Sequence, residues 1–384
     1  MSYFHLNLIL KGKLTVCCLL MLSVIPLNAQ REAKQIGDFK ESISLNEHLR
    51  GTKRTLQYCP DGDEFVCVNG KNRYTRALYG SHSPFRVETS DRPVFAFYNN
   101  GRGGNISFKV ILRDGTELAL DRTGYCESRY SAGKRTYYLT DPSWGKGELR
   151  ISVLALADMD GAIWRFSPSN MPKGAILRWQ HGGATGKRLS RNGDMGVDPA
   201  DCFELPAEAT DLVTGELALQ KEVYLVRGEV PEGYNVRKLY QQAEAASLAL
   251  ASHLKIETPD PYLNTLGGAL VAAADGIWDG QVWLHGAIGW RMPLSGWRAG
   301  YTGDALGWHD RARTHFDAYA ASQVTDVPNT IPHPAQDSTM NLARSEKRWG
   351  TPQYSNGYIC RNPERNNQMH HYDTVSYTHL RAHE

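Results

Sequence analysis

The hydrophobic positions between about residues 55 and 226 fall in short runs that glycine, proline, aspartate and asparagine interrupt. Between these runs, no stretch shows the length and spacing that indicate a helix. Short apolar runs joined by turn residues are typical of antiparallel strands, so residues 30–234 are predicted to form an antiparallel β-sandwich. The runs that define the expected strands are 64–68, 94–98, 149–156, 162–166, 175–179 and 222–226.

At Asn235 the spacing of apolar residues changes from that of strands to the three-to-four spacing of helices. Asn235 can accept a hydrogen bond at a helix N-terminus, which predicts a linker helix in residues 235–259. A second helix is expected from Pro261, a residue favoured in the first helical turn, and a third from Thr302. The fold class is therefore β followed by α, with a helical domain over residues 260–373.

The N-terminal segment predicts export from the cytoplasm. Lys11 and Lys13 precede an apolar run over residues 14–25, and small-residue cleavage is expected after Ala29. The alternative, a membrane anchor, requires about twenty apolar residues, which is longer than this run. Residues 1–29 are therefore interpreted as a signal peptide, and the protein is expected to be periplasmic or secreted, with no membrane span after cleavage.

Composition narrows the classes of partner. The formal net charge of the 384 residues is +2, and no basic run is present, which argues against nucleic acid or an anionic membrane as the main partner. The cysteines beyond the signal peptide match no zinc-binding spacing, so no metal or other cofactor is predicted. Cys59 and Cys67 could form a disulfide or remain buried thiols, and the sequence leaves both open. The other three cysteines are Cys126, Cys202 and Cys360.

Residues 283–311 carry the densest concentration of candidate chemistry. Aromatic rings can stack on sugars, arginine and histidine can bind hydroxyl groups, and a carboxylate such as Asp304 can act as acid or base. The candidate substrate-binding residues in this segment are Trp290, Trp297, Arg298, Trp308 and His309. The structural alternative places Trp290 and Trp297 in a core and Asp304 in the first turn of a helix, where the helix dipole favours a carboxylate.

A second polar cluster occupies residues 354–373. It contains His370 and His371, which are candidates for substrate binding, and ends at Asp373, a candidate second carboxylate. Adjacent histidines point in different directions on a helix or a strand, so they do not indicate a metal pair. A polar binding loop that leads into a helix fits the pattern better, and a solvated loop without function is the alternative.

Three motifs together carry a resemblance to a known family. Residues 76–93 (Arg-Ala-Leu-Tyr-Gly-Ser-His-Ser-Pro-Phe-Arg-Val-Glu-Thr-Ser-Asp-Arg-Pro) and 296–305 (Gly-Trp-Arg-Ala-Gly-Tyr-Thr-Gly-Asp-Ala), together with His-His-Tyr-Asp at 370–373, resemble exported proteins of Bacteroidetes glycan-degradation systems. In that family a domain of unknown function precedes a six-hairpin glycosidase. The resemblance implies an (α/α)6 toroid that hydrolyses a polysaccharide or oligosaccharide with paired carboxylates.

The Gly-Trp…Gly-Asp stretch that begins at residue 296 is also similar to α-L-rhamnosidases, in which an acidic residue stands just before the Gly-Trp pair. Residues 292–295 are Met-Pro-Leu-Ser here and hold no carboxylate, so the general acid and the sugar specificity stay open. A polysaccharide lyase that uses Tyr372 or His371 as its base is a rival, and a non-catalytic glycan-binding protein is another.

Residues 374–384 show no apolar period and resemble a translated sequencing adapter, although a natural polar tail is the alternative. Natural sequence is expected to end near Asp373, inside the toroid. The helical domain is therefore expected to be truncated and the chain by itself inactive.

Overall fold

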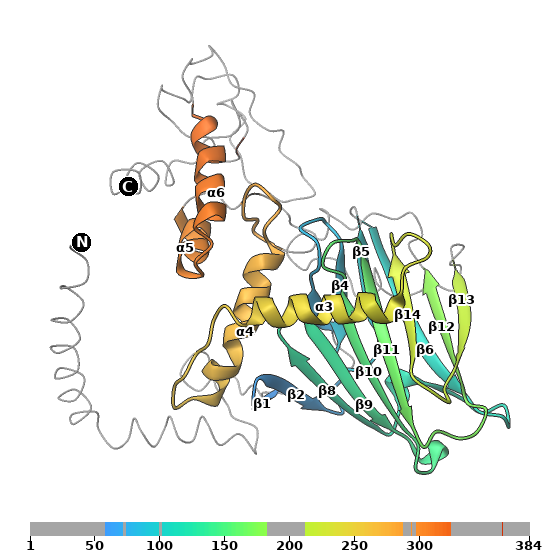
Figure 1. Cartoon of the computed structure of the whole chain (residues 1–384). Coiled ribbons are helices and arrows are strands. Elements are labelled where there is room, and N and C mark those ends of the chain that lie inside the picture. Colours follow the sequence, from blue (N-terminus) through green and yellow to red (C-terminus); the bar gives the residue numbers. More distant parts are fainter. Residues whose placement is uncertain are drawn as a thin grey trace, which may run out of the picture.

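The computed structural model describes residues 58–71, 74–99, 102–182, 212–286 and 297–323, together with the single residues 293 and 363. The proposed signal peptide, Cys202, Cys360 and residues 374–384 lie outside this part of the chain. Within it, two antiparallel β-sheets are followed along the chain by four helices (Figure 1).

The first sheet has seven strands, and its earliest and latest strands along the chain form its two edges. In that order the strands are β1 (Cys59–Asp61), β2 (Glu64–Val68), β8 (Tyr125–Ser131), β9 (Lys134–Thr140), β10 (Glu148–Ala155), β11 (Gly161–Ser169) and β14 (Val223–Gly228).

The second sheet also has seven strands. Its main order is β13 (Val213–Ala218), β12 (Ile176–Gly182), β6 (Arg102–Ile111), β5 (Phe95–Asn99), β4 (Arg86–Ser90) and β3 (Tyr74–Leu78), while β7 (Glu117–Ala119) pairs with β6. Every strand pair in both sheets is antiparallel, as the sequence predicts.

The two sheets enclose one hydrophobic core. Trp164 of β11 is fully buried, and its ring lies 5.5 Å from that of Phe95 in β5 and 6.2 Å from that of Phe108 in β6. Aromatic side chains that bury this much surface dominate the energetics of a core. Because these rings come from opposite sheets, they hold the sandwich together.

Helix α3 (Val236–Ala251) covers the outer face of the first sheet (Figure 1). The side-chain oxygen of Asn235 accepts a hydrogen bond from the Lys238 backbone at 3.0 Å, so the expected cap is confirmed. Leu239 packs in one cluster with Leu154 and Ile163, which belong to the neighbouring strands β10 and β11. These strands are therefore buried on both faces, by the opposite sheet and by α3.

Helix α4 (Pro261–Gly276) begins as the sequence predicts, with proline in the first turn and Asp260 as its cap. It lies across the end of the first sheet, where Thr265 donates a hydrogen bond to the backbone carbonyl of Gly62 at 2.9 Å. Gly267 approaches the carbonyl of Leu254 so closely that a Cβ would lie 2.7 Å from it. This glycine permits α4 to sit tightly against the segment that follows α3.

The expected single helix from Thr302 is wrong, because two helices occupy this segment. Helix α5 (Trp297–Ala305) ends before Gly307, and α6 (His309–Ala321) begins after it. Gly307 has φ of 75°, a left-handed conformation that favours glycine and ends a helix. Asp304 therefore lies in the last turn of α5, and the interpretation of it as a carboxylate in an N-terminal turn is wrong.

The cysteines and the helices settle two smaller points. Cys59, Cys67 and Cys126 are free thiols, so the possible disulfide between Cys59 and Cys67 is not formed. Among the described helices, none combines the length and the apolar character that crossing a bilayer requires. The β-then-α order is confirmed, whereas the closed toroid and the domain boundaries stay predictions.

Candidate functional site

Several residues that the sequence singles out fall outside the described structure. Trp290, His370, His371 and Asp373 lie in segments that are not described. Trp297 and Arg298 belong to the first turn of α5, and their side chains are likewise outside the description. Asp304, Trp308 and His309 are the predicted site residues whose surroundings the structure gives.

The turn between α5 and α6 brings two of these residues into contact. Nδ1 of His309 lies 2.8 Å from Oδ1 of Asp304, and the two side chains are 68% and 70% exposed. Gly307 makes this contact possible, because the turn at its positive φ sets the first residue of α6 beside the last turn of α5. The result is a carboxylate–imidazole pair in which both side chains are exposed to solvent.

Trp308 precedes His309 and contacts residues of α6 and of the segment after α3. The guanidinium of Arg311 lies 4.4 Å from the centre of the Trp308 ring, within the range of a cation–π contact. The ring of His253, just after α3, lies 5.7 Å from the same tryptophan. Asp304, at the end of α5, thus lies near Trp308 and Arg311 across the turn that leads into α6.

The sequence reasoning missed Asp275, a buried carboxylate that contacts two side chains distant in the sequence. Its Oδ1 accepts a hydrogen bond from Nη1 of Arg311 at 2.7 Å and lies 3.1 Å from Nε2 of His82. The Asp275 side chain is only 12% exposed. Burial acts to raise the pKa of Asp275, but the hydrogen bonds with His82 and Arg311 outweigh it and lower that pKa.

Asp275 therefore joins elements that are far apart in the sequence. His82 belongs to the loop between β3 and β4, Asp275 to the end of α4 and Arg311 to α6. We call these three residues the junction triad. In the sequence, only its place before Gly276 marks Asp275. His82 is marked only by its position in the motif at residues 76–93.

One tryptophan of the candidate segment, Trp283, is structural. Trp283 is fully buried, and its ring centre lies 4.6 Å from that of Trp278, with the two rings tilted at 56°. Its indole nitrogen donates a hydrogen bond to the Ala274 carbonyl at 3.2 Å. A Cβ on Gly303 would overlap the Trp283 ring, so this glycine permits α5 to approach. Part of the glycine and tryptophan pattern of the segment thus reflects close packing between helices.

The motif at residues 76–93 connects the sandwich to α4. Arg86 is fully buried, donates a hydrogen bond to the backbone carbonyl of Gly276 at 2.5 Å and lies over the ring of Tyr79 at 5.1 Å. On the same strand, burial raises the pKa of the Glu88 carboxyl to about 7, although the charge of Arg86 opposes this shift. The motif therefore holds the C-terminal end of α4.

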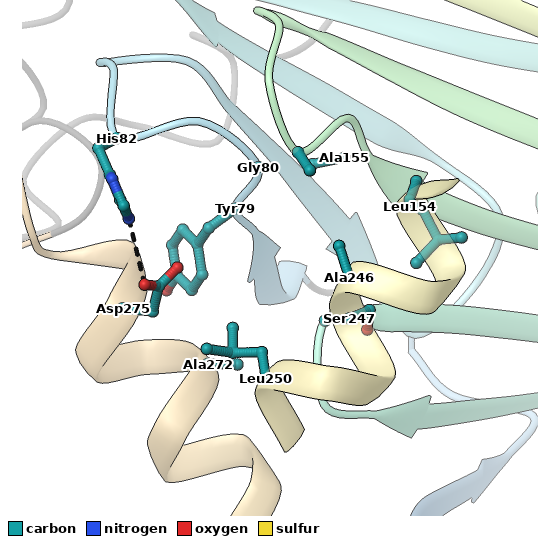
Figure 2. Close-up of a pocket in the computed structure, with 13 residues that line it drawn as sticks. Tyr79, Gly80, His82, Leu154, Ala155, Ala246, Ser247, Leu250, Ala272 and Asp275 are labelled. Atoms are coloured by element: carbon teal, nitrogen blue, oxygen red, sulfur yellow. Dashed lines mark hydrogen bonds and ion pairs between the residues drawn. The ribbon is translucent and has the colours of Figure 1, made fainter. Parts of the chain in front are cut away.

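A pocket of about 170 Å³ opens beside the junction triad, between the sandwich, α3 and α4. We call it the junction pocket. Figure 2 shows Tyr79 and Asp275 on one side and Ala246 and Leu250 of α3 on the other. The remaining wall is largely apolar and includes Leu154 and Ala272.

No group of three or more histidine, cysteine, aspartate or glutamate side chains in the described residues is arranged to hold a metal ion. The junction triad, in which Asp275 is already bonded to Arg311, is an ion-paired network and not a coordination site.

Comparison with known proteins gives two similarities. Residues 100–230, from β6 to β14, match a family described as a domain of unknown function (DUF4450). This agrees with the expectation that a domain of unknown function stands in the N-terminal part. Comparison with curated proteins gives no match.

The second similarity is to a solved structure, a bacterial glucoamylase in complex with acarbose. The sequences are 11% identical, the TM-score is 0.42, and the alignment covers 76% of this chain and 57% of the glucoamylase. The chain thus spans little more than half the length of that enzyme. Neither similarity assigns an activity to this chain.

Proposed function

We propose that this protein is a glycoside hydrolase that cleaves O-glycosidic bonds in a complex polysaccharide. The observation that carries the proposal is the contact of Asp304 with His309 beside Trp308 and Arg311. Enzymes that bind and cleave a sugar chain use these groups: a carboxylate, an imidazole, an indole and a guanidinium. The motif resemblance of residues 296–305 supports the same reaction class.

In the proposed mechanism Asp304 is one of two catalytic carboxylates and Asp373 is the other. One carboxylic acid protonates the departing glycosidic oxygen, and the second carboxylate activates water or attacks the anomeric carbon. The contact with Nδ1 of His309 at 2.8 Å orients the Asp304 carboxylate.

The remaining predicted residues are assigned to substrate binding. Tryptophan rings stack on pyranose C–H faces, and arginine and histidine donate hydrogen bonds to hydroxyl groups. The proposed binding residues are Trp290, Trp297, Arg298, Trp308, His309, His370 and His371. We further propose that residues 260–373 belong to an (α/α)6 toroid and that the protein acts in the periplasm or outside the cell.

The reaction class is tested by the products of the protein expressed from its complete gene. A panel of neutral and uronic polysaccharides is incubated with it in ¹⁸O-labelled water, and the products are analysed by mass spectrometry. Hydrolysis predicts one ¹⁸O atom in each newly formed chain end. Unsaturated, ultraviolet-absorbing ends without the label would show a lyase, and glycan binding without turnover would show a binding protein; either result contradicts the proposal.

A further inference from the structure

The junction pocket presents two polar oxygens that no described side chain uses. Oδ1 of Asp275 carries both bonds of the junction triad, which leaves Oδ2 without a hydrogen bond in the described part of the chain. The hydroxyl of Tyr79 likewise has no hydrogen-bond partner there. Neither oxygen is sealed in the interior, and both residues line the pocket (Figure 2).

The chemistry of these two oxygens defines what they can bind. Burial, and then the nearby charge of Glu88, raise the pKa of the Tyr79 hydroxyl, so it stays protonated and can donate as well as accept. Asp275 is ionised, because its hydrogen bonds lower its pKa, and its free oxygen can only accept. A ligand that bonds to both oxygens therefore requires a hydroxyl or amine donor for Asp275, beside a group that can accept from the Tyr79 hydroxyl.

The charge of the site favours a neutral ligand. The carboxylate of Asp275 is already paired with the guanidinium of Arg311 at 2.7 Å, so the pair carries no net charge. A cationic ligand would compete with Arg311 for the same carboxylate. Neighbouring hydroxyl groups satisfy both oxygens without adding a charge to a partly buried site.

The size and the opposite wall limit the ligand further. Pockets for drug-sized molecules are commonly about 300–1,000 Å³, whereas this pocket measures about 170 Å³. Its far wall consists of short or aliphatic side chains, including Ala243, Ala246 and Leu250 of α3. An apolar wall opposite two hydrogen-bonding oxygens matches the C–H face and the hydroxyl edge of one sugar ring.

We infer that the junction pocket is an accessory site for a single neutral sugar ring. The sugar's adjacent hydroxyls bond to Tyr79 and Asp275, and its C–H face lies against α3. This site is separate from the Asp304 and His309 pair and does not depend on the proposed hydrolysis. Because it lies between the sandwich, α3 and α4, an occupant would contact all three.

The test measures binding of D-glucose, D-galactose, D-mannose and L-rhamnose by calorimetry and by saturation-transfer NMR. For a ligand of this size we expect a dissociation constant of about 1 mM for at least one sugar. Ala246→Trp places an indole at the exposed mouth of the pocket and is expected to weaken binding about tenfold or more. Leu248→Trp, on the 61%-exposed side chain of the same helix, is the matched control and leaves binding unchanged.

A second variant pair tests recognition by hydroxyl groups. Tyr79→Phe removes only the phenol oxygen and is expected to weaken binding about fivefold, whereas Tyr138→Phe, on a 38%-exposed tyrosine, has no effect. The inference is overturned if none of the four sugars binds, or if binding persists unchanged in Ala246→Trp or Tyr79→Phe. The protein could bind a sugar in the junction pocket without hydrolysing glycosidic bonds, or hydrolyse them without binding a sugar in this pocket. The failure of one proposal is therefore distinguishable from the failure of the other.

Discussion

At the scale of single residues, the junction triad shows how one carboxylate can connect separate parts of a chain. Asp275 accepts a hydrogen bond from Arg311 and contacts His82, although its side chain is largely buried. A buried ionic group stabilises a fold only when its partners are present, because an unpaired charge in such a position is strongly unfavourable. The triad is therefore a sensitive point of the structure.

Replacing Asp275 with alanine tests this dependence. The variant leaves the Arg311 guanidinium, whose side chain is 26% exposed, without its acceptor. We expect the free energy of unfolding to fall by about 2 kcal/mol, the usual contribution of a hydrogen bond to a charged group. Chemical denaturation at neutral pH measures it. Asp310→Ala, at a carboxylate that is 96% exposed, is the control, and an equal loss in both variants would contradict the account.

Glu88 supplies a prediction with a defined pH range. Burial raises the pKa of the Glu88 carboxyl from the usual glutamate value of 4.5 to about 7 in the folded protein. The unfolded chain therefore releases this proton at a lower pH than the folded protein does. Neutral Glu88 contributes its full stability below about pH 4.5, and this stability is lost as the pH rises through about 7. At about 1.4 kcal/mol per pKa unit, this loss is about 3 kcal/mol.

The Glu88→Gln variant cannot make this transition. The difference in unfolding free energy between the native protein and Glu88→Gln is expected to change by about 3 kcal/mol between pH 4.5 and pH 8, with the native protein losing stability. Denaturant titrations of both proteins at several pH values within that range measure the difference. A difference independent of pH would show that Glu88 is not held in its neutral form.

At the scale of secondary structure, local sequence determines much of what is observed. The strands β2, β10 and β11 occupy the expected apolar runs to within a few residues, and the caps at Asn235 and Asp260 begin α3 and α4. These features depend on neighbouring residues, so their signals are present in a short stretch of sequence.

The cap of α3 can be tested separately from its packing. Asn235→Ala removes the acceptor of the Lys238 backbone N–H, and we expect it to lower the free energy of unfolding by about 1 kcal/mol. Asn235→Asp retains an acceptor in the same place and should preserve stability. Thermal unfolding of the three proteins makes the comparison, and equal stability of the alanine and aspartate variants would show that the cap is not important.

The error over α5 and α6 has an equally local cause. The apolar spacing from Thr302 onward continues through Leu306 and suggests one helix. Gly307 nevertheless adopts a left-handed conformation and separates two helices. A glycine inside a periodic segment is compatible with a continuous helix or with a break, and the contact between α5 and α6 decides between them.

At the scale of the whole molecule, the elements could be predicted but most contacts of the candidate site could not. His82 and Asp275 are 193 positions apart, and nothing near either residue indicates the other. Trp283 illustrates the converse, because a tryptophan in a site-like segment turned out to be fully buried against other helices. Pairings of this kind follow from how the sandwich, α3 and α4 pack, which residue spacing does not encode.

The central claim is that the protein hydrolyses glycosidic bonds with Asp304 as one of its carboxylates. The most direct measurement is kcat for release of reducing ends by the protein from its complete gene, compared between the native form, Asp304→Asn and Asp310→Asn. The account predicts that Asp304→Asn lowers kcat by about 1,000-fold, whereas Asp310→Asn, whose exposed carboxylate lies near the start of α6, retains native kcat. Unchanged kcat in Asp304→Asn, or an equal loss in Asp310→Asn, would contradict it.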